Sequence, residues 1–536
     1  MGVASWNRFT ASPRRLDHTA VLSFVALAAF LLYSAHPLLA TGLRPVDDHE
    51  YLSFRLINPS GSPWTAWLDA TFYISAEFEG ARWRPLYQFG RAVTTAFISD
   101  WAAPRYALRL ALTAFVVWGI ALRLVGTFAP SIRSASLRFL AIVTAGMILF
   151  SIADWSDVSA RLGPQELFAL TGATLALLAM SETPRRRHQV ALLSGIVIMS
   201  SFKENFASLA VIFLVSVLAF SPLHRRQRVI HVSLMISLVS VAMSVLAVRS
   251  KGNSDFYGNQ RTAATIFKSL SSFTDSSRLE WSAVLLVLAF LAARREARRT
   301  VICIGSSLLV ALASEWIVYG DDMNGYGRYA IASDLIVGSL LAAVLLLLCQ
   351  RLLNRITKKH FVPFGLSLIL ALITASLAVP FAKSIHEASS AARREALSWS
   401  NAVQEVLTES TSHDAEAILI IVDISDGSET GRLEKSVALM RFLAFYSEEP
   451  RDLYLTLQAL PQDSEPSEFT RKIRANLENR SELGGVDKTD LGSTVIRHKP
   501  IREFDPGSNV LCVQYSSSGR ANSFTNACNK SIRFNA

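Results

Sequence analysis

Residues 330–349 read AIASDLIVGSLLAAVLLLLC, an apolar run whose one charged residue is Asp334. A transmembrane helix needs about 20 such residues to cross the hydrocarbon core of a bilayer. A short basic segment follows, with Arg351, Arg355, Lys358 and Lys359. Arginine and lysine concentrate on the cytoplasmic side of membrane spans. The stretch therefore predicts a span whose basic end faces the cytoplasm.

The same pattern recurs along the chain. Of its 536 residues, 51% are hydrophobic and only 18% are charged, and its mean hydropathy is +0.31, which is too apolar for a soluble protein of this length. About eleven apolar runs can span a membrane, the shorter ones with help from polar flanks. They lie near 17–40, 104–128, 138–152, 164–181, 189–202, 206–221, 229–248, 280–293, 300–318, 330–349 and 361–380. We therefore predict an α-helical polytopic membrane protein.

The position of the charge, rather than its net value of +10, predicts the topology. The N-terminal tail and every second short gap between the runs are basic, which is the positive-inside pattern. The other basic gaps hold Arg133 and Arg138, Arg185 to Arg187, Arg225, Arg226 and Arg228, and Arg294, Arg295, Arg298 and Arg299. This pattern predicts a cytoplasmic N-terminus and a C-terminal region outside the cytoplasm. It also explains the basicity without a nucleic acid as partner. The first span is expected to stay as an uncleaved anchor.

Two domains are expected, a membrane domain over residues 1–384 and a small α/β domain over 385–536. Strand-like runs at 417–422, 453–460, 493–498 and 509–515 alternate with helical patterns near 431–446 and 467–478, which is typical of an α/β domain. A polar helix over 382–410 is expected to join the two domains. Cys512 and Cys528 could pair if the outer compartment is oxidising.

The first outer loop, residues 41–103, is long and rich in aromatic residues, and its segments 63–74 and 85–98 are predicted to be helices lying in the membrane interface. A plain aromatic belt is the competing interpretation. The loop also carries Asp47-Asp48-His49-Glu50 and Arg82-Trp83-Arg84-Pro85. Carboxylates at a membrane interface are costly, and chains seldom keep them there without a use.

Two further charged groups are predicted on the same side of the membrane: Lys203-Glu204-Asn205, and Asp321-Asp322 with Arg328. Acids near phosphate-binding cations suit the transfer of a sugar from a lipid phosphate. A carboxylate would take the proton of the acceptor hydroxyl, and cations would stabilise the departing phosphate. Asp47 or Asp48 would be the base, and Arg82, Arg84, Lys203 or Arg328 would hold the phosphate.

Alternatives stay open at several of these positions. Lys203 and Glu204 could form a structural ion pair at a tight turn. His49 could bind a metal, orient a neighbour or be an ordinary interfacial histidine, so the sequence leaves open whether a divalent cation is required. Asp423 and Asp426 could form a binding loop, although a surface turn is the simpler interpretation.

In the order and sidedness of these motifs, residues 1–380 resemble the GT-C class of membrane glycosyltransferases, which includes protein O-mannosyltransferases and lipid A aminoarabinose transferases. Asp47-Asp48 stands where the class has its acidic motif, and Lys203-Glu204 is similar to a Lys-Glu pair at a corresponding hairpin. Arg82 to Tyr87 resembles an R-x-R-P-L segment of bacterial members, and Arg328 lies in a loop where the class presents an arginine to the lipid phosphate.

The resemblance implies an inverting transferase of the bacterial inner membrane, active in glycan biosynthesis at the cell envelope. Its donor would be a polyprenyl-phosphate-linked sugar and its acceptor an extracytoplasmic glycan, lipid or protein, with Asp47 and Asp48 catalytic. The substrate-binding residues would be Glu50, Arg82, Arg84, Lys203, Glu204 and Arg328.

Two other functions compete with this prediction. A transporter or flippase for a lipid-linked or anionic solute would also use interfacial charges, but transporters place them near the midplane, often in two related halves. A sensor or assembly protein would need only an anchor, and about eleven spans exceed that need.

Overall fold

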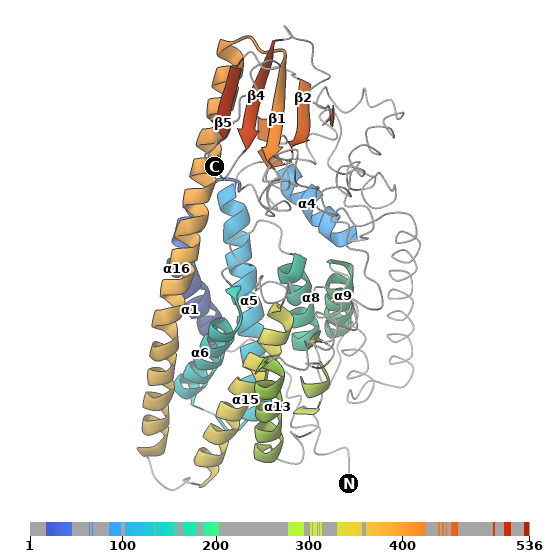
Figure 1. The fold of residues 1–536 in the computed structure, drawn as a ribbon. Coiled ribbons are helices and arrows are strands. Elements are labelled where there is room, and N and C mark those ends of the chain that lie inside the picture. The colour runs from blue at the N-terminus through green and yellow to red at the C-terminus, as the bar shows by residue number, and fades with distance from the viewer. Residues whose placement is uncertain are drawn as a thin grey trace.

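The structure is a computed structural model. It describes residues 18–44, 64, 67, 85–97, 102–132, 134–155, 158, 165–179, 186–202, 277–293, 298, 301–302, 304–307, 309, 311–312, 330–355, 361–423, 438–439, 442–443, 446, 452–458, 497–498, 509–515 and 530–534. The described part is a bundle of helices with a parallel β-sheet beyond one of its ends (Figure 1).

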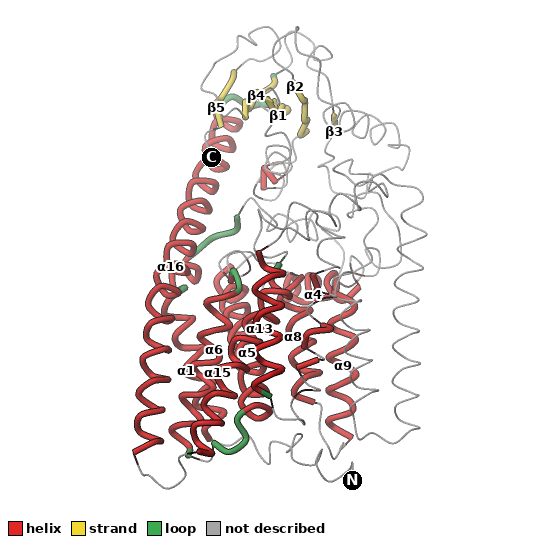
Figure 2. The backbone as a smooth tube through the Cα atoms, turned by 60° about the horizontal axis from the view of Figure 1, so that its bottom comes forward, coloured by secondary structure: helices red, strands yellow, loops and turns green. Residues whose placement is uncertain are grey.

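The bundle is built from long apolar helices (Figure 2). The helices are α1 (His18–Ser34), the 3₁₀ helix η2 (His36–Ala40), α4 (Pro85–Phe97), α5 (Ala102–Phe128), α6 (Ala135–Ile152), α8 (Gln165–Ala179), α9 (Arg186–Phe202), α13 (Ser277–Ala292), α15 (Ile331–Arg355) and α16 (Phe361–Ser412). Four of those described, α5, α6, α15 and α16, are long and apolar enough to cross a membrane. The chain is thus a polytopic helical membrane protein. The expected spans 206–221 and 229–248 lie outside the described residues, so the count of eleven stays a prediction.

Contacts near the helix ends show which ends of the described helices lie together. Phe381 of α16 stacks on Phe150, close to the C-terminal end of α6, with ring centroids 5.0 Å apart. That end of α6 also meets the N-terminal part of α15, where a Cβ on Gly338 would lie 3.2 Å from the side chain of Leu149. Arg351, close to the opposite end of α15, donates hydrogen bonds to the last carbonyls of α13. We call the end that carries the sheet the sheet end and the opposite one the far end.

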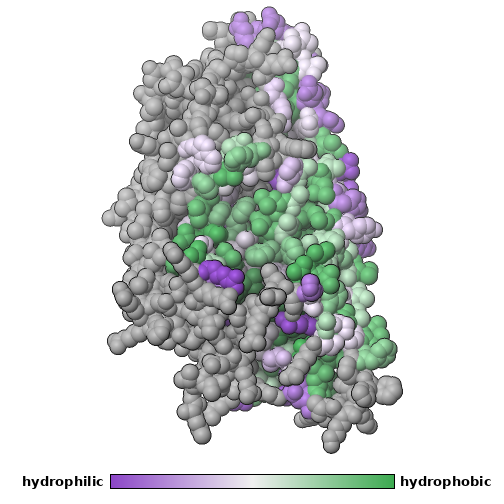
Figure 3. All heavy atoms as spheres, turned by 180° about the vertical axis from the view of Figure 1, so that it is seen from behind, coloured by the Kyte–Doolittle hydropathy of each residue, from purple (hydrophilic) through white to green (hydrophobic). Residues whose placement is uncertain are grey.

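Polar contacts and small residues hold the helices together inside the apolar bundle. The indole Nε1 of Trp118 in α5 donates to the carbonyl of Ala20 in α1 over 2.8 Å, and the hydroxyls of Thr144 in α6 and Thr374 in α16 lie 2.8 Å apart. Inside a bilayer there is no water to drive the helices together. Interhelical hydrogen bonds and van der Waals packing therefore hold them in contact. Lipid-facing side chains surround this core, and Figure 3 shows a hydrophobic surface over the bundle with hydrophilic side chains along its edge toward the sheet.

Helix α16 is a single helix of 52 residues, about 78 Å long at 1.5 Å per residue. The sequence predicts a span at 361–380 and a polar helix over 382–410, and α16 contains both without a break, passing the expected domain boundary at 384/385. It ends where Asp414 takes a left-handed φ of 49°, a conformation that stops a helix.

The sheet has five parallel strands in the order β3-β2-β1-β4-β5. The strands are β1 (Ala417–Asp423), β2 (Asp452–Gln458), β3 (Arg497–His498), β4 (Val510–Tyr515) and β5 (Lys530–Phe534). The first four coincide with runs that predict strands, and β5 is not predicted. Ile418 to Ile420 and Val510 to Val513 are buried, as expected for central strands of a parallel sheet. Trp399 of α16 packs on Phe442, with ring centroids 5.8 Å apart.

Candidate active site at the sheet end of the bundle

The eight predicted site residues lie outside the described residues. These are Asp47, Asp48, Glu50, Arg82, Arg84, Lys203, Glu204 and Arg328. The structure does describe the helix ends that adjoin them, and those ends have defined packing. The described helix ends next to these residues therefore define the surroundings of the candidate site.

The segment before Asp47 is fixed to α16. After α1, Pro37 opens the short helix η2, and the hydroxyl of Thr41 donates to the carbonyl of Pro37 over 2.8 Å. Arg44 then forms a charge-assisted contact with Glu395 of α16, in which its Nε donates to Oε2 over 2.9 Å and its Nη2 donates to the same oxygen. Both side chains are partly shielded from water, which strengthens the pair. The chain is therefore fixed to α16 at Arg44, three residues before Asp47.

The segment after Arg84 becomes α4, which matches the interfacial helix predicted for 85–98. Pro85 stands at its first position, where a missing N–H costs nothing. Arg91 is buried, donates from Nη2 to the hydroxyl of Tyr87 over 2.7 Å, and lies 4.2 Å from the centroid of that ring. Trp64 and Trp67 pack their rings against Phe89. Helix α4 thus organises the described aromatic residues of the first outer loop.

The segment before Lys203 is the end of α9. Its last residue, Phe202, stacks on Phe168 of α8 with ring centroids 5.0 Å apart. A Cβ on Gly90 of α4 would lie 3.8 Å from the same Phe202 ring. Helix α4 of the first outer loop and the end of α9 that precedes Lys203 therefore pack together, although they lie over a hundred residues apart in sequence.

The segment after Arg328 begins α15. Ala330 and Ile331 are buried, and the hydroxyl of Ser333 donates to the carbonyl of Ala330 over 2.9 Å. Since this part of α15 packs on the C-terminal part of α6, it also lies toward the sheet end. All four predicted segments therefore adjoin described elements directed to the same end of the bundle (Figure 1).

Three buried charged residues near this end are not anticipated from the sequence. Arg105 and Arg109 lie in the first turns of α5 with 4% and 1% of their surface exposed, and Glu166 lies in the first turn of α8 with 3% exposed. Each has an interaction partner, as a buried charge requires. Their sequence signal is a charge inside an otherwise apolar run, which in a membrane protein marks a functional region. Fixed arginines here suit an anionic substrate.

In the described part of the chain, no group of three or more His, Cys, Asp or Glu side chains could hold a metal ion. His49 and its acidic neighbours lie outside that part, so the question of a divalent cation at the acidic cluster is untouched by this finding.

No protein-family model matches the chain. No curated protein matches it either. Among solved structures, the chain is similar to the crystal structure of ArnT from Cupriavidus metallidurans bound to undecaprenyl phosphate, with 14% sequence identity, coverage of 89% of each chain and a TM-score of 0.46. A likeness of that size does not by itself identify a function.

Proposed function

We propose that the protein is an inverting membrane glycosyltransferase that passes a sugar from a polyprenyl phosphate to an acceptor outside the cytoplasm. One observation carries the proposal: the segments holding the acidic cluster, the Arg82–Arg84 motif, the Lys203-Glu204 pair and Arg328 all adjoin described helix ends or anchored loops at the sheet end. The described elements next to these four charged motifs lie at one end of the bundle (Figure 1), which supports a shared site there.

The chemistry follows from the residue types. The hydroxyl oxygen of the acceptor attacks the anomeric carbon while Asp47 or Asp48 accepts its proton as general base. The bond between the anomeric carbon and the phosphate oxygen breaks, and its electron pair leaves with the polyprenyl phosphate. Positive charge develops on the sugar ring, as in other glycosyl transfers. Attack from the face opposite the leaving phosphate inverts the anomeric centre.

The basic residues would act on the phosphate. Arg82, Arg84, Lys203 and Arg328 can neutralise the departing group, and a bidentate arginine also fixes its orientation. Glu50 and Glu204 would position the sugar hydroxyls or the cations. The buried Arg105 and Arg109 of α5 add positive potential at the same end of the bundle.

The proposed orientation puts the far end in the cytoplasm of a bacterial inner membrane. Four described basic residues support it by lying at or near far-end helix termini, namely Arg138, Arg187, Arg298 and Arg351. Cys512 in the sheet is disulfide-bonded, which is typical of an oxidising compartment. Cys528, the predicted partner of Cys512, lies outside the described residues.

The direct test replaces each carboxylate in turn. Asp47→Asn and Asp48→Asn remove the proposed base without changing side-chain size, and at least one of them should lower transfer of a radiolabelled sugar from polyprenyl phosphate by about 10²-fold or more. Glu387→Gln is the matched control, because Glu387 is an exposed carboxylate on α16 whose contact with Lys383 spans 4.0 Å.

Thermal melting and size-exclusion profiles should match those of the unchanged protein for all three variants. Full activity in both single variants and in the double variant would refute the assignment of the base. Uptake of a lipid-linked solute into vesicles, with no chemical turnover, would favour a transporter instead.

A further inference from the structure

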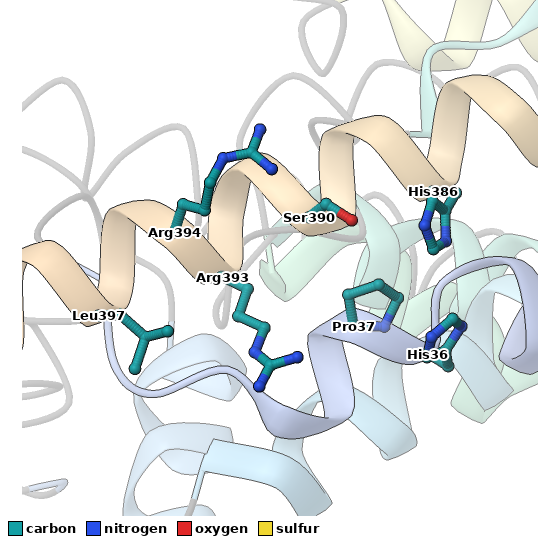
Figure 4. Close-up of a pocket in the computed structure, with 7 residues that line it drawn as sticks. All are labelled: His36, Pro37, His386, Ser390, Arg393, Arg394 and Leu397. Carbon is teal, nitrogen blue, oxygen red and sulfur yellow. The ribbon is translucent and has the colours of Figure 1, made fainter.

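A groove with a volume of about 390 Å³ lies between η2 and α16 at the sheet end. Two histidines, two arginines and a serine supply its polar lining: His36, His386, Ser390, Arg393 and Arg394. Figure 4 shows the rings of His36 and His386 close together across the groove, and Arg393 reaching from α16 toward η2. The ring centroids are 5.2 Å apart. None of these residues belongs to the predicted catalytic set, so this inference does not depend on the proposed function.

The groove lies at the level where the lipid-facing surface ends. On α16 a run of exposed large apolar side chains ends at Val379, which is 72% exposed, and the next one along the helix is Leu397 in the groove lining. On α1 the last exposed large apolar side chain is Tyr33, which is 79% exposed. Three residues beyond Tyr33 the chain exposes His36, and beyond Val379 it exposes Lys383 and His386. Tyrosine favours this boundary between hydrocarbon and water. Lipid phosphates lie in the adjoining headgroup layer.

The groove favours anions because its described lining carries two guanidinium groups and no carboxylate. Among the described residues, neither the Arg393 nor the Arg394 guanidinium has a hydrogen-bonding or ionic partner. The neighbouring Glu395 is engaged by Arg44, and Glu387 lies 4.0 Å from Lys383. The two nearest acids on α16 are therefore at least partly neutralised, while the arginines keep their donors.

The histidines and the serine complete the polar lining. The Nδ1 of His36 lies 2.9 Å from the carbonyl oxygen of Tyr33. A carbonyl oxygen can only accept, so Nδ1 carries the hydrogen in this contact and donates it to Tyr33, which fixes the orientation of the ring. Ser390 contributes a hydroxyl on the α16 side.

We infer that this groove binds the phosphate group of a membrane lipid in the leaflet at the sheet end. Guanidinium groups match phosphate oxygens in geometry and charge, and basic pockets at a membrane interface are a known basis for headgroup recognition. Lipid bound there would hold η2, and with it the segment leading to Asp47, against α16.

Native mass spectrometry of the full chain, released from mixed micelles, tests this inference. The probes are phosphatidylglycerol and a diacylglycerol with the same acyl chains but no phosphate. The unchanged protein should retain phosphatidylglycerol at least tenfold more strongly. Arg393→Gln should weaken that retention about tenfold, the size expected for one charge-assisted hydrogen bond. His386→Gln should weaken it as well, and Arg393→Lys should restore part of it.

Lys383→Gln is the matched control, since it removes one exposed positive charge from the same helix outside the groove. It should retain lipid as the unchanged protein does. Equal retention by Arg393→Gln and the unchanged protein, or equal retention of diacylglycerol, would overturn the inference.

Two competition arms identify the source of the phosphate. Displacement of phosphatidylglycerol by an equal concentration of polyprenyl phosphate would support a site for lipid phosphates in general. Displacement by inorganic phosphate at that concentration would show a free-phosphate site and would overturn the assignment to a lipid. Melting profiles check that each variant is folded.

Discussion

At the scale of single residues, the pair formed by Arg44 and Glu395 joins the first outer loop to α16. Its side chains are 16% and 32% exposed, so the surroundings screen their attraction less than bulk water does. A pair of this kind both stabilises the fold and positions the next residues of the chain. Here those residues are the acidic cluster, which begins three positions after Arg44.

Breaking this pair should lower both stability and activity. Arg44→Ala and Glu395→Gln should each reduce the free energy of unfolding by about 1–2 kcal/mol, since each leaves a partly buried charged or polar group without its partner. The double variant should lose less than the sum, as a double-mutant cycle of melting in detergent would record. Lys383→Gln is the control, because its exposed pair with Glu387 is worth less than about 0.5 kcal/mol. Additive losses would show that the two residues are not coupled.

The sequence predicts where the charged motifs near the sheet end lie along the chain, but it does not predict their contacts. The acidic and basic motifs can be found because they interrupt apolar runs next to predicted spans. The contact between Arg44 and Glu395 joins residues 351 positions apart, and no local pattern reports such a contact. Arg105, Arg109 and Glu166 escape prediction because they lie within helical runs, where a sequence does not show which side faces the protein interior.

At the scale of elements, α8 and α9 cross at a pair of glycines. A Cβ on Gly172 would lie 2.6 Å from the carbonyl oxygen of Gly195, and a Cβ on Gly195 would lie 2.5 Å from that of Gly172. These are backbone atoms that cannot move aside alone. Small residues at such crossings let membrane helices approach closely. The crossing fixes the end of α9, from which Lys203 and Glu204 continue.

Gly172→Ala and Gly195→Ala should therefore each destabilise the protein by about 1–3 kcal/mol, as overpacking does. Sugar transfer should fall with them, because pushing α9 away also disturbs the stacking of Phe202 on Phe168. Gly126→Ala provides the matched control, as Gly126 is a helical glycine with nothing within 4 Å of an added Cβ. Melting midpoints and transfer rates measure both effects. Unchanged melting in the two crossing variants would contradict the close packing.

Helix α16 is continuous through a proline, which local sequence rules do not predict. Composition predicts its two halves as helices, but the chain also has Pro380 within the helix, and proline removes a hydrogen bond and favours a break. Tertiary packing outweighs that preference here, since Phe381 beside it packs on Phe30 and Phe150. Periodicity predicts elements, whereas their continuity depends on contacts between distant segments.

At the scale of the whole molecule, the bundle and the sheet share α16 as their connection. Its C-terminal half carries Trp399, which packs on Phe442. Asn509 donates from Nδ2 to the carbonyls of His413 and Asp414, so the end of α16 is bonded to the residue before β4. The sheet therefore has a fixed attachment on the side where the predicted site segments emerge.

The proposed orientation makes a prediction about the two ends of the bundle. Ser136, in the first turn of α6 at the far end, and Ser398 of α16, beyond the sheet end, are both exposed serines. In intact cells a membrane-impermeant maleimide should label Ser398→Cys and not Ser136→Cys, because the bilayer separates the two positions. Permeabilised cells should give labelling of both. Cys349 is buried and Cys512 is disulfide-bonded, and the unsubstituted chain measures the remaining background. Labelling of Ser136→Cys in intact cells, with Ser398→Cys protected, would invert the topology and place the acidic cluster in the cytoplasm, where an extracytoplasmic acceptor could not reach it.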